Sequence, residues 1–248
     1  MKVDDLWFPY APRARSEAST LLFCFAHASG AASAYRTWSG ARGPAVEVHA
    51  VQLPGRENRL REPLLTSMAE AVDRLTPVLE ARIDRPFAIY GHSLGGLLGY
   101  EVAVRLQKGG RVPSLLAVSG RRAPQLPAEP PLVHQYSDDG LVEYMRAAGG
   151  TPEAILREPE MLALLLPVLR ADITMLETNP PRTTPLDCDI LAFRGTSDRL
   201  ANHEDVERWR EVTSGQFGFH EFDAGHFFAP SVVSQLQQHL LRHLRSPG

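Results

Sequence analysis

Short apolar runs alternate along the chain with longer segments in which apolar positions recur at helical spacing. Strands that are apolar on both faces are typical of a parallel sheet covered by helices. The pattern therefore predicts an α/β fold with a mostly parallel central sheet flanked by helices. The predicted strands lie at 20–26, 46–52, 87–90, 115–119, 190–193 and 217–222, and the predicted helices between them at 67–83, 94–109, 203–213 and 231–245.

The helix predicted at 67–83 carries both a start signal and a break signal. Ser67 is followed three residues later by Glu70, which is the spacing of a capping box. Pro77 lies inside the segment, and its ring and missing N–H should kink or split the helix.

The alternation stops between Gly120 and Ile190, where about seventy residues pass without a convincing strand. A proline-rich stretch at 123–131 opens this interval, and helical patterns follow at 140–148 and 159–177. We expect a helical lid over the carboxyl edge of the sheet, inserted at about 123–185 into a single domain that spans 1–248. The second of these helices is apolar well beyond one stripe, so it is either buried in the domain or a dimer contact, or it lines a hydrophobic substrate channel.

Composition and charge narrow the classes of function. A chain of 248 residues with 44% apolar content can form one large globular domain. Its 26 basic and 29 acidic residues give a net charge of −3, with no basic arm, which argues against a nucleic-acid binder. The longest apolar run, 161–169, contains a proline and falls far short of the ~20 residues that span a bilayer. We therefore expect neither nucleic acid nor membrane as a partner.

The cysteines and the first ten residues bear on the cellular compartment. Cys24 and Cys188 both lie in apolar, strand-like runs, and the opening MKVDDLWFPY lacks the apolar block of a signal peptide. We expect a cytoplasmic protein with reduced thiols. Because this fold needs no partner to complete its core, we also expect a monomer.

The most informative short segment is Gly91-His-Ser-Leu-Gly95, which follows a predicted strand and opens a predicted helix. It fits the Gly-x-Ser-x-Gly turn that presents a nucleophilic serine at the carboxyl end of a central strand. Side chains at the two glycines would collide across so tight a turn. The helix N-terminus would also direct N–H groups toward the group under attack. We therefore predict that Ser93 is a catalytic nucleophile rather than part of a structural glycine-rich turn.

A serine hydroxyl needs a base and an acid that orients the base, in the chain order Ser, acid, His for this type of fold. His226 lies in a loop just after the last predicted strand, preceded by Gly225, and is the predicted base. Asp198 follows the strand at 190–193 and is the predicted acid. Five other acidic residues are less suitable for this role. Asp187 and Asp189 precede a strand, Asp223 leaves the last strand too early to orient His226, and Glu204 and Asp205 belong to the start of the next helix.

The oxyanion formed by serine attack requires backbone N–H donors. In this type of site one donor follows the nucleophile and the other lies in the loop after an early strand. Leu94 is the first predicted donor, and Ala28 in the loop 26–31 is the second.

Four segments distributed over nearly the whole chain carry a family resemblance: Leu22-Phe-Cys-Phe-Ala-His-Ala-Ser-Gly with Trp38 after it; Gln52-Leu-Pro-Gly-Arg-Glu-Asn-Arg; Gly91-His-Ser-Leu-Gly-Gly; and Phe193-Arg-Gly-Thr-Ser-Asp with Gly225-His-Phe-Phe. In these segments the sequence resembles the type II thioesterases, the separate editing enzymes that accompany nonribosomal peptide and polyketide synthases. The Leu-Pro-Gly-Arg-Glu segment is the most specific feature, because general esterases and lipases do not usually carry it.

The resemblance implies an α/β-hydrolase fold with a helical lid. It assigns Ser93, Asp198 and His226 to the catalytic triad, and Ala28 and Leu94 to the oxyanion hole. Two positions of the oxyanion loop depart from the family pattern: Ala26 stands where Pro is usual, and Ser29 stands where Gly is usual.

The resemblance also implies a substrate, an acyl group held as a thioester on the phosphopantetheine arm of an acyl or peptidyl carrier domain. Hydrolysis would clear stalled or wrongly loaded carriers, with no metal or cofactor beyond the arm that the substrate brings. Two alternatives remain open: a medium-chain fatty acyl thioesterase of a fatty acid synthase, and a non-catalytic module that binds carrier domains. A lipase or carboxylesterase is disfavoured by the thioesterase-like segments.

Carrier domains are generally acidic, so a mildly acidic enzyme needs a local basic patch to bind them. Arg121 and Arg122, at the end of the strand 115–119, are candidates for this patch, although a solvated surface pair is the favoured interpretation. His27 in the oxyanion loop is a further candidate contact to substrate or carrier.

Overall fold

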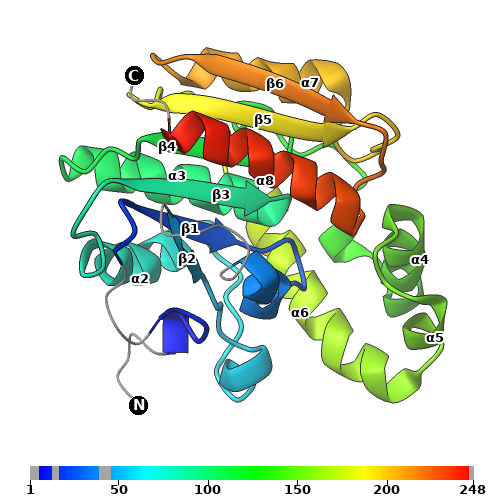
Figure 1. The fold of residues 1–248 in the computed structure, drawn as a ribbon. Helices are drawn as coiled ribbons and strands as arrows, with labels where there is room; N and C mark the ends of the chain where they lie inside the picture. Colours follow the sequence, from blue (N-terminus) through cyan, green and yellow to red (C-terminus); the bar gives the residue numbers. More distant parts are fainter. Residues whose placement is uncertain (1–5, 13–16, 39–45, 246–248) are drawn as a thin grey trace.

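The computed structural model describes residues 6–12, 17–38 and 46–245. Within these residues, six strands form one parallel sheet in the order β2-β1-β3-β4-β5-β6 (Figure 1). The predicted α/β class with a parallel sheet is confirmed. The strands are β1 (Thr20–Phe25), β2 (Val46–Ala50), β3 (Phe87–His92), β4 (Leu115–Ser119), β5 (Asp189–Gly195) and β6 (Phe217–Phe222).

The sheet is covered on both faces, as its doubly apolar strands predict. Alternate residues of β1 point to opposite sides: Leu21 and Phe23 join one buried cluster, and Leu22 and Cys24 join the other. Helices α2 (Met68–Glu80) and α3 (Leu94–Lys108) pack on the first face. Helix α8 (Pro230–Arg245) crosses the second face, in front of the sheet in Figure 1.

The helices differ from the predictions in two details. Helix α2 runs through Pro77 as a single element, so the predicted split is wrong; the proline lies in the last turn, only three residues before the helix ends at Glu80. Ser67 caps this helix as predicted, because its hydroxyl oxygen accepts a hydrogen bond from the Glu70 N–H at 3.4 Å. The segment predicted as one helix at 203–213 is α7 (His203–Glu207) followed by the 3₁₀ turn η5 (Arg208–Val212).

Three helices fill the interval between β4 and β5. They are α4 (Asp138–Ala148), the short α5 (Glu153–Leu156), which was not predicted, and α6 (Pro159–Glu177). Figure 1 places them beyond the carboxyl ends of the strands, outside the layers that cover the sheet. Their apolar side chains form a third buried cluster of Leu141, Met145, Leu156, Leu166, Leu169 and Ile173. Burial within the domain therefore accounts for most of the apolar surface of α6.

Both cysteines are free and buried. In the described ranges, no helix combines the length and the apolar character needed to cross a membrane. Residues 1–5, on which part of the expectation about a signal peptide depends, lie outside the described residues.

Candidate active site

Ser93 occupies the single-residue turn between β3 and α3. Its backbone is strained, with φ of 53° and ψ of −116°, a conformation that non-glycine residues adopt only when the surroundings impose it. Two main-chain hydrogen bonds impose it here: the Ser93 N–H donates to Ser119 O at 2.8 Å, and the Gly96 N–H donates to Ser93 O at 3.0 Å. The hydroxyl is thereby presented at the carboxyl edge of the sheet.

The glycines on either side of Ser93 are required by close approach of the backbone. A Cβ atom on Gly91 would lie 2.1 Å from Gly95 O, and one on Gly95 would lie 2.1 Å from Phe25 O. Such contacts are far inside the van der Waals limit, and backbone atoms cannot move away cheaply. The steric role predicted for these glycines agrees with the geometry.

His226 and Asp198 form a buried pair at the same edge of the sheet. Asp198 lies just after β5, and its Oδ2 accepts a hydrogen bond from His226 Nδ1 at 2.9 Å. Its other oxygen accepts the Leu200 N–H at 2.8 Å, which fixes the rotation of the carboxylate. The side chains of His226 and Asp198 are 5% and 0% exposed. Residues 28 positions apart in sequence are thus joined as predicted.

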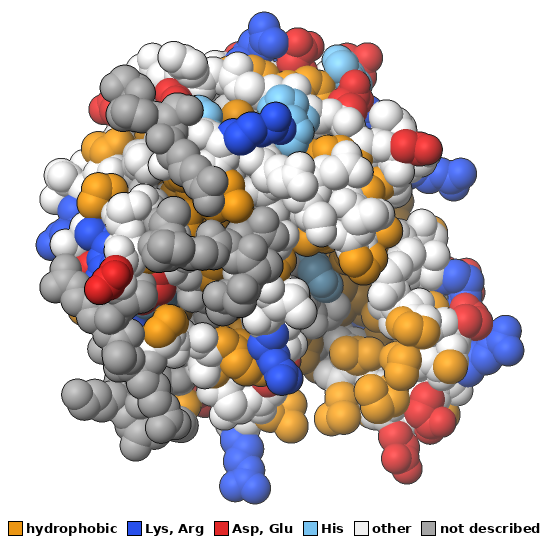
Figure 2. Space-filling model, in the orientation of Figure 1, with side chains coloured by type: hydrophobic (Ala, Val, Ile, Leu, Met, Phe, Trp, Pro, Cys, Tyr) orange, Lys and Arg blue, Asp and Glu red, His pale blue; other side chains and the backbone are white. Residues whose placement is uncertain are grey.

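Ser93 and His226 line one cavity between the sheet edge and the helices of the insertion. Figure 2 shows this face hollowed, with a histidine at the base of the hollow and hydrophobic side chains gathered on the insertion side. Within the described part of the chain, the Ser93 hydroxyl makes no direct hydrogen bond to His226. Such bonds are often long in the free enzyme and tighten when substrate binds. The remaining lining residues include Ala28, Tyr144, Met145, Leu169, Leu200 and Phe227.

The loop after β1 forms a tight turn beside this cavity. The Gly30 N–H donates to His27 O at 2.9 Å, and Ser29, the third residue of the turn, has a positive φ of 60°. A positive φ at this position is typical of a type II turn and favours glycine. This explains why Gly is usual in the family where Ser29 stands. Ala28, the predicted oxyanion donor, is the second residue of the turn.

Two other histidines surround His226. The His27 ring contacts Phe227, and His92 lies 5.1 Å from His226 between ring centroids. His92 Nδ1 is 2.7 Å from Ser119 Oγ, so this ring nitrogen is hydrogen-bonded to the end of β4. Burial lowers the pKa of His27. Burial, and then the neighbouring imidazoles, lower the pKa of His92 well below its usual value.

These buried histidines predict acid sensitivity. Their folded-state pKa lies below the usual value of about 6.5, so below pH ~6.5 the unfolded chain binds more protons than the folded chain and stability falls. Each histidine contributes a loss of up to about 1.4 kcal/mol per pH unit. Thermal unfolding between pH 7.5 and 5.5 should therefore show a falling Tm, and His92→Asn should make the slope shallower. An unchanged slope in the variant would contradict the role of His92.

Gly120 supports the geometry of His226 from the end of β4. It has a φ of 57°, and a Cβ there would lie 2.9 Å from His92 Cε1 and 3.2 Å from His226 Cε1. Gly120→Ala should therefore displace the imidazole and lower kcat by up to about 100-fold, because small misplacements of catalytic groups are costly. Gly110→Ala is the matched control, since Gly110 also has a positive φ but nothing lies within 4 Å of its added Cβ. Equal kcat values for the two variants, measured on folded protein, would refute this account.

The acids that sequence reasoning set aside lie in other contacts. Asp189 begins β5 and pairs with His243 at 2.9 Å, at the opposite end of the strand from Asp198. Asp205 lies in the first turn of α7, where its N–H donates to the side-chain oxygen of the capping residue Asn202 at 2.8 Å. His239 of α8 packs against His220 of β6, with ring centroids 4.0 Å apart.

Arg121 and Arg122 do not form the solvated surface pair that the sequence favoured. Arg122 donates to Asp205 at 2.6 Å and pairs with Glu129, so its charge is already matched within the chain. Arg121 is half-buried, and burial lowers its pKa to about 10. A contact between these two arginines and a carrier domain stays a prediction, and the ion pairs of Arg122 within the chain weaken the support for its part in such a contact.

Sequence reasoning missed two parts of the site. The wall opposite Ser93 comes mainly from α4 and the loop after it, through Tyr144, Met145 and 148–151, rather than from α6. The helical pattern at 140–148 identified the helix, but its short apolar stripe did not indicate a cavity wall. The second omission is the buried ion pair of Arg56 and Asp172 beside Ala28. Arg56 falls in a family-like motif, whereas nothing in the local sequence distinguishes Asp172.

Comparison with known proteins is consistent with this geometry. The family model described as thioesterase domain matches residues 20–246. The chain is 36% identical to the gramicidin S biosynthesis protein GrsT of Aneurinibacillus migulanus over 96% of its own length and 94% of that protein. It is 30% identical to the human medium-chain S-acyl fatty acid synthase thioesterase, covering 86% of this chain and 82% of that protein. Among solved structures, the type II thioesterase BorB from the borrelidin biosynthetic cluster superposes with a TM-score of 0.87 at 35% identity, covering 97% of this chain and 98% of BorB.

Proposed function

This chain belongs to the thioesterase family, as a type II editing thioesterase of nonribosomal peptide and polyketide pathways, and from this premise we propose that Ser93, His226 and Asp198 are its catalytic triad. The observation that carries the assignment is the buried His226–Asp198 hydrogen bond in the cavity that Ser93 also lines. The strained turn at Ser93 supports the role of nucleophile.

The hydrogen bond between His226 and Asp198 sets the direction of proton transfer. Nδ1–H donates to the carboxylate, so the lone pair of Nε2 is left to accept the proton of the Ser93 hydroxyl. The serine oxygen then attacks the thioester carbonyl, and the C–S bond breaks as the tetrahedral intermediate collapses. The leaving thiolate takes the proton from His226. Water, deprotonated by the same imidazole, hydrolyses the acyl-serine in the second half of the reaction.

Two main-chain N–H groups are the proposed donors to the oxyanion. Leu94 begins α3, and the first N–H groups of a helix have no partner within it. Ala28 lies across the cavity in the turn after β1. Loss of one such donor typically lowers kcat by about 10²–10³-fold, so the position of this turn matters for the rate.

Type II thioesterases act on acyl groups bound to the carrier proteins of synthases, and we propose the same substrate class here. The phosphopantetheine arm belongs to the substrate, and the proposed steps use only groups of this chain. Helices α4, α5 and α6 are the proposed lid, because α4 and α6 line the cavity and all three helices lie beyond the carboxyl ends of the strands (Figure 1). We propose that the enzyme acts as a monomer, since both faces of its sheet are covered within one chain.

The substrate class can be tested by intact-protein mass spectrometry of a carrier protein loaded with acetyl, octanoyl or an aminoacyl group. We expect the mass of each loaded carrier to return to that of the free phosphopantetheine form after incubation. Hydrolysis of octanoyl carrier alone would favour the medium-chain fatty acyl activity of the human relative. Stable complex formation without any loss of the acyl group would favour a binding module and contradict the proposal.

A further inference from the structure

We propose that the buried pair of Arg56 and Asp172 is a positioning device that holds the turn at 27–30 in the conformation required for the Ala28 N–H to reach the oxyanion. The inference depends on the proposed function, because the role of Ala28 as a donor is part of it. Neither Arg56 nor Asp172 touches the cavity that contains Ser93, so both would act through the turn.

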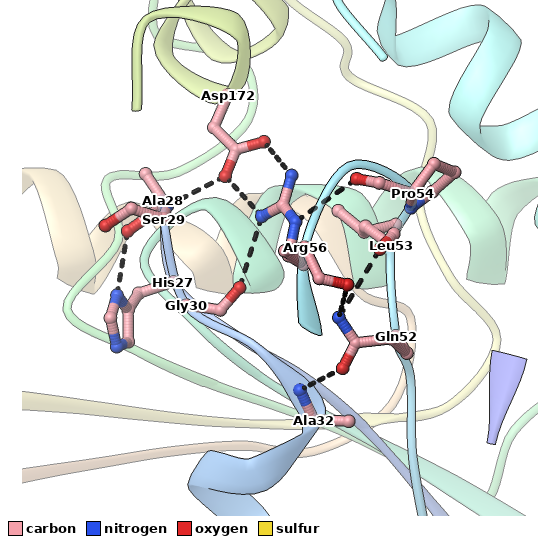
Figure 3. A network of polar contacts seen from close by, with 10 residues as sticks. All are labelled: His27, Ala28, Ser29, Gly30, Ala32, Gln52, Leu53, Pro54, Arg56 and Asp172. Atoms are coloured by element: carbon pink, nitrogen blue, oxygen red, sulfur yellow. Dashed lines mark hydrogen bonds and ion pairs between the residues drawn. The ribbon is translucent and has the colours of Figure 1, made fainter. Parts of the chain in front are cut away.

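The pair is buried and joined by two parallel hydrogen bonds (Figure 3). The side chains of Arg56 and Asp172 are 6% and 0% exposed. The guanidinium donates to both carboxylate oxygens, with NH1 to Oδ2 at 2.6 Å and NH2 to Oδ1 at 2.8 Å. Its Nε donates to Pro54 O at 3.3 Å. A bidentate geometry of this kind holds both partners in fixed orientation.

The same two side chains hold the turn itself. Asp172 Oδ2 accepts the Ser29 N–H at 2.8 Å, and Arg56 NH1 donates to Gly30 O at 3.1 Å. Figure 3 shows the carboxylate reaching the Ala28–Ser29 peptide from above, while His27 Nδ1 contacts Ala28 O at 2.9 Å. The central peptide of the turn is therefore held at its N–H end by Asp172 and at its C=O end by His27.

This chain needs such support because of the residue at position 29. Ser29 has a φ of 60°, a left-handed backbone conformation that strains a non-glycine residue. Rotation of the central peptide would give a type I turn, in which the third residue has a negative φ and no such strain. That rotation would break the bonds to both Asp172 and His27. Glycine, usual in the family at this position, would incur no strain in the observed turn.

The direction of the proposed donor is set by the peptide between His27 and Ala28, and the supports of the turn hold that peptide in place. The peptide that carries the Ala28 N–H also carries His27 O, which accepts the Gly30 N–H at 2.9 Å. Because N–H and C=O point in opposite directions in a trans peptide, the Ala28 N–H points away from the turn. Arg56 donates to Gly30 O, and the Gly30 N–H donates to His27 O. These two hydrogen bonds connect the ion pair to the peptide that carries the donor.

Gln52 completes the support from the family-like Gln-Leu-Pro-Gly-Arg segment. Its side-chain oxygen accepts the Ala32 N–H at 2.9 Å, and its amide donates to Arg56 O at 3.4 Å. Asp172 is contributed by α6, 116 residues from Arg56 and 143 from Ser29. The turn thus receives its supports from two segments, one of them in the helical insertion.

The first test is Asp172→Asn, assayed with an acyl N-acetylcysteamine thioester. Both carboxylate oxygens accept from N–H donors, so either orientation of an amide would place its NH₂ against a donor. We expect kcat to fall by about 10–100-fold, part of the loss of a whole oxyanion donor, with KM changed less than about threefold. Affinity for a trifluoromethyl ketone analogue of the acyl group should fall by the same factor as kcat/KM.

The decisive variant is the double substitution Asp172→Asn with Ser29→Gly. Glycine reaches a positive φ without strain, so it should restore a large part of the kcat that Asp172→Asn loses. A purely structural role for Asp172 predicts no such rescue. Glu177→Gln is the matched control, because Glu177 also lies on α6 and accepts hydrogen bonds from Val133 N and His134 N but does not contact the turn.

A second variant tests the same inference without leaving one charged side chain buried and unpaired. Replacing both partners, Arg56→Met with Asp172→Leu, exchanges the ion pair for apolar side chains, a change that is often neutral for stability. We expect this variant to fold and to show the same loss of kcat.

The inference would be overturned by a wild-type kcat in the folded variant that carries Arg56→Met and Asp172→Leu. It would also be overturned if Ser29→Gly did not restore the kcat of Asp172→Asn. Wild-type activity in Ser93→Ala would instead overturn the proposed function, so the two failures are distinguishable.

Discussion

Ser93→Ala is expected to lower turnover of a carrier-bound acyl thioester by about 10⁶-fold, the loss typical of removing a serine nucleophile. The substitution removes the only group in the proposed mechanism that forms a covalent bond to the acyl carbon. The fold should be retained, because the turn is held by main-chain hydrogen bonds to Ser119 and Gly96 and alanine can occupy the same backbone position. Circular dichroism and thermal unfolding would confirm that folding is unchanged.

The acyl-enzyme intermediate gives an independent readout of the same prediction. Rapid quenching of the wild-type enzyme with substrate should trap a mass increase of one acyl group on the peptide that contains Ser93, and Ser93→Ala should show none. Ser33→Ala is the control, because Ser33 is an exposed residue of the segment that follows the turn at 27–30. Turnover by Ser93→Ala within about tenfold of wild type would require a different nucleophile.

Asp198→Asn is expected to lower kcat by about 10⁴-fold while preserving the fold. The Leu200 N–H donates to Asp198 Oδ1, so the oxygen of the introduced amide would be held there and its NH₂ would face His226. His226 Nδ1 would then have to accept rather than donate. The proton would move to Nε2, and that nitrogen could no longer take the proton of Ser93.

Asp189→Asn provides a closely matched control for this variant. Asp189 also lies on β5 and also contacts a histidine at 2.9 Å, but its partner is His243, at the far end of the strand from the cavity. We expect its kcat to stay close to that of the wild type. Near-normal turnover of Asp198→Asn would assign the acid to another residue, and equal losses in both variants would indicate a general loss of stability.

The local sequence predicted those features that depend on neighbouring residues. Every one of the six predicted strands is present, because runs such as 115–119 are apolar on both faces and can be buried only inside a covered sheet. The nucleophile turn was equally readable, since Gly91 and Gly95 report a steric requirement within five residues. The departure at Ser29 was also visible, although its backbone strain was not.

Two predictions, those for Pro77 and Arg122, were not met by the structure. Pro77 was expected to kink or split α2, but the helix continues through it to Glu80 as one element. Arg122 was expected on a solvated face, but the fold brings Asp205 to it from 83 residues away. Sequence periodicity does not reveal which distant charge will neutralise a given arginine.

Local pattern by itself determined the parallel sheet and the strained serine turn, because each depends on sterics or burial within a few residues. Only the tertiary structure decided which side chains surround the turn at 27–30 and which helix closes the cavity. It placed Asp172 of α6 against Ser29 and closed the cavity with α4. Contacts between segments more than a hundred residues apart arise from packing of the whole chain, and no short stretch of sequence encodes them.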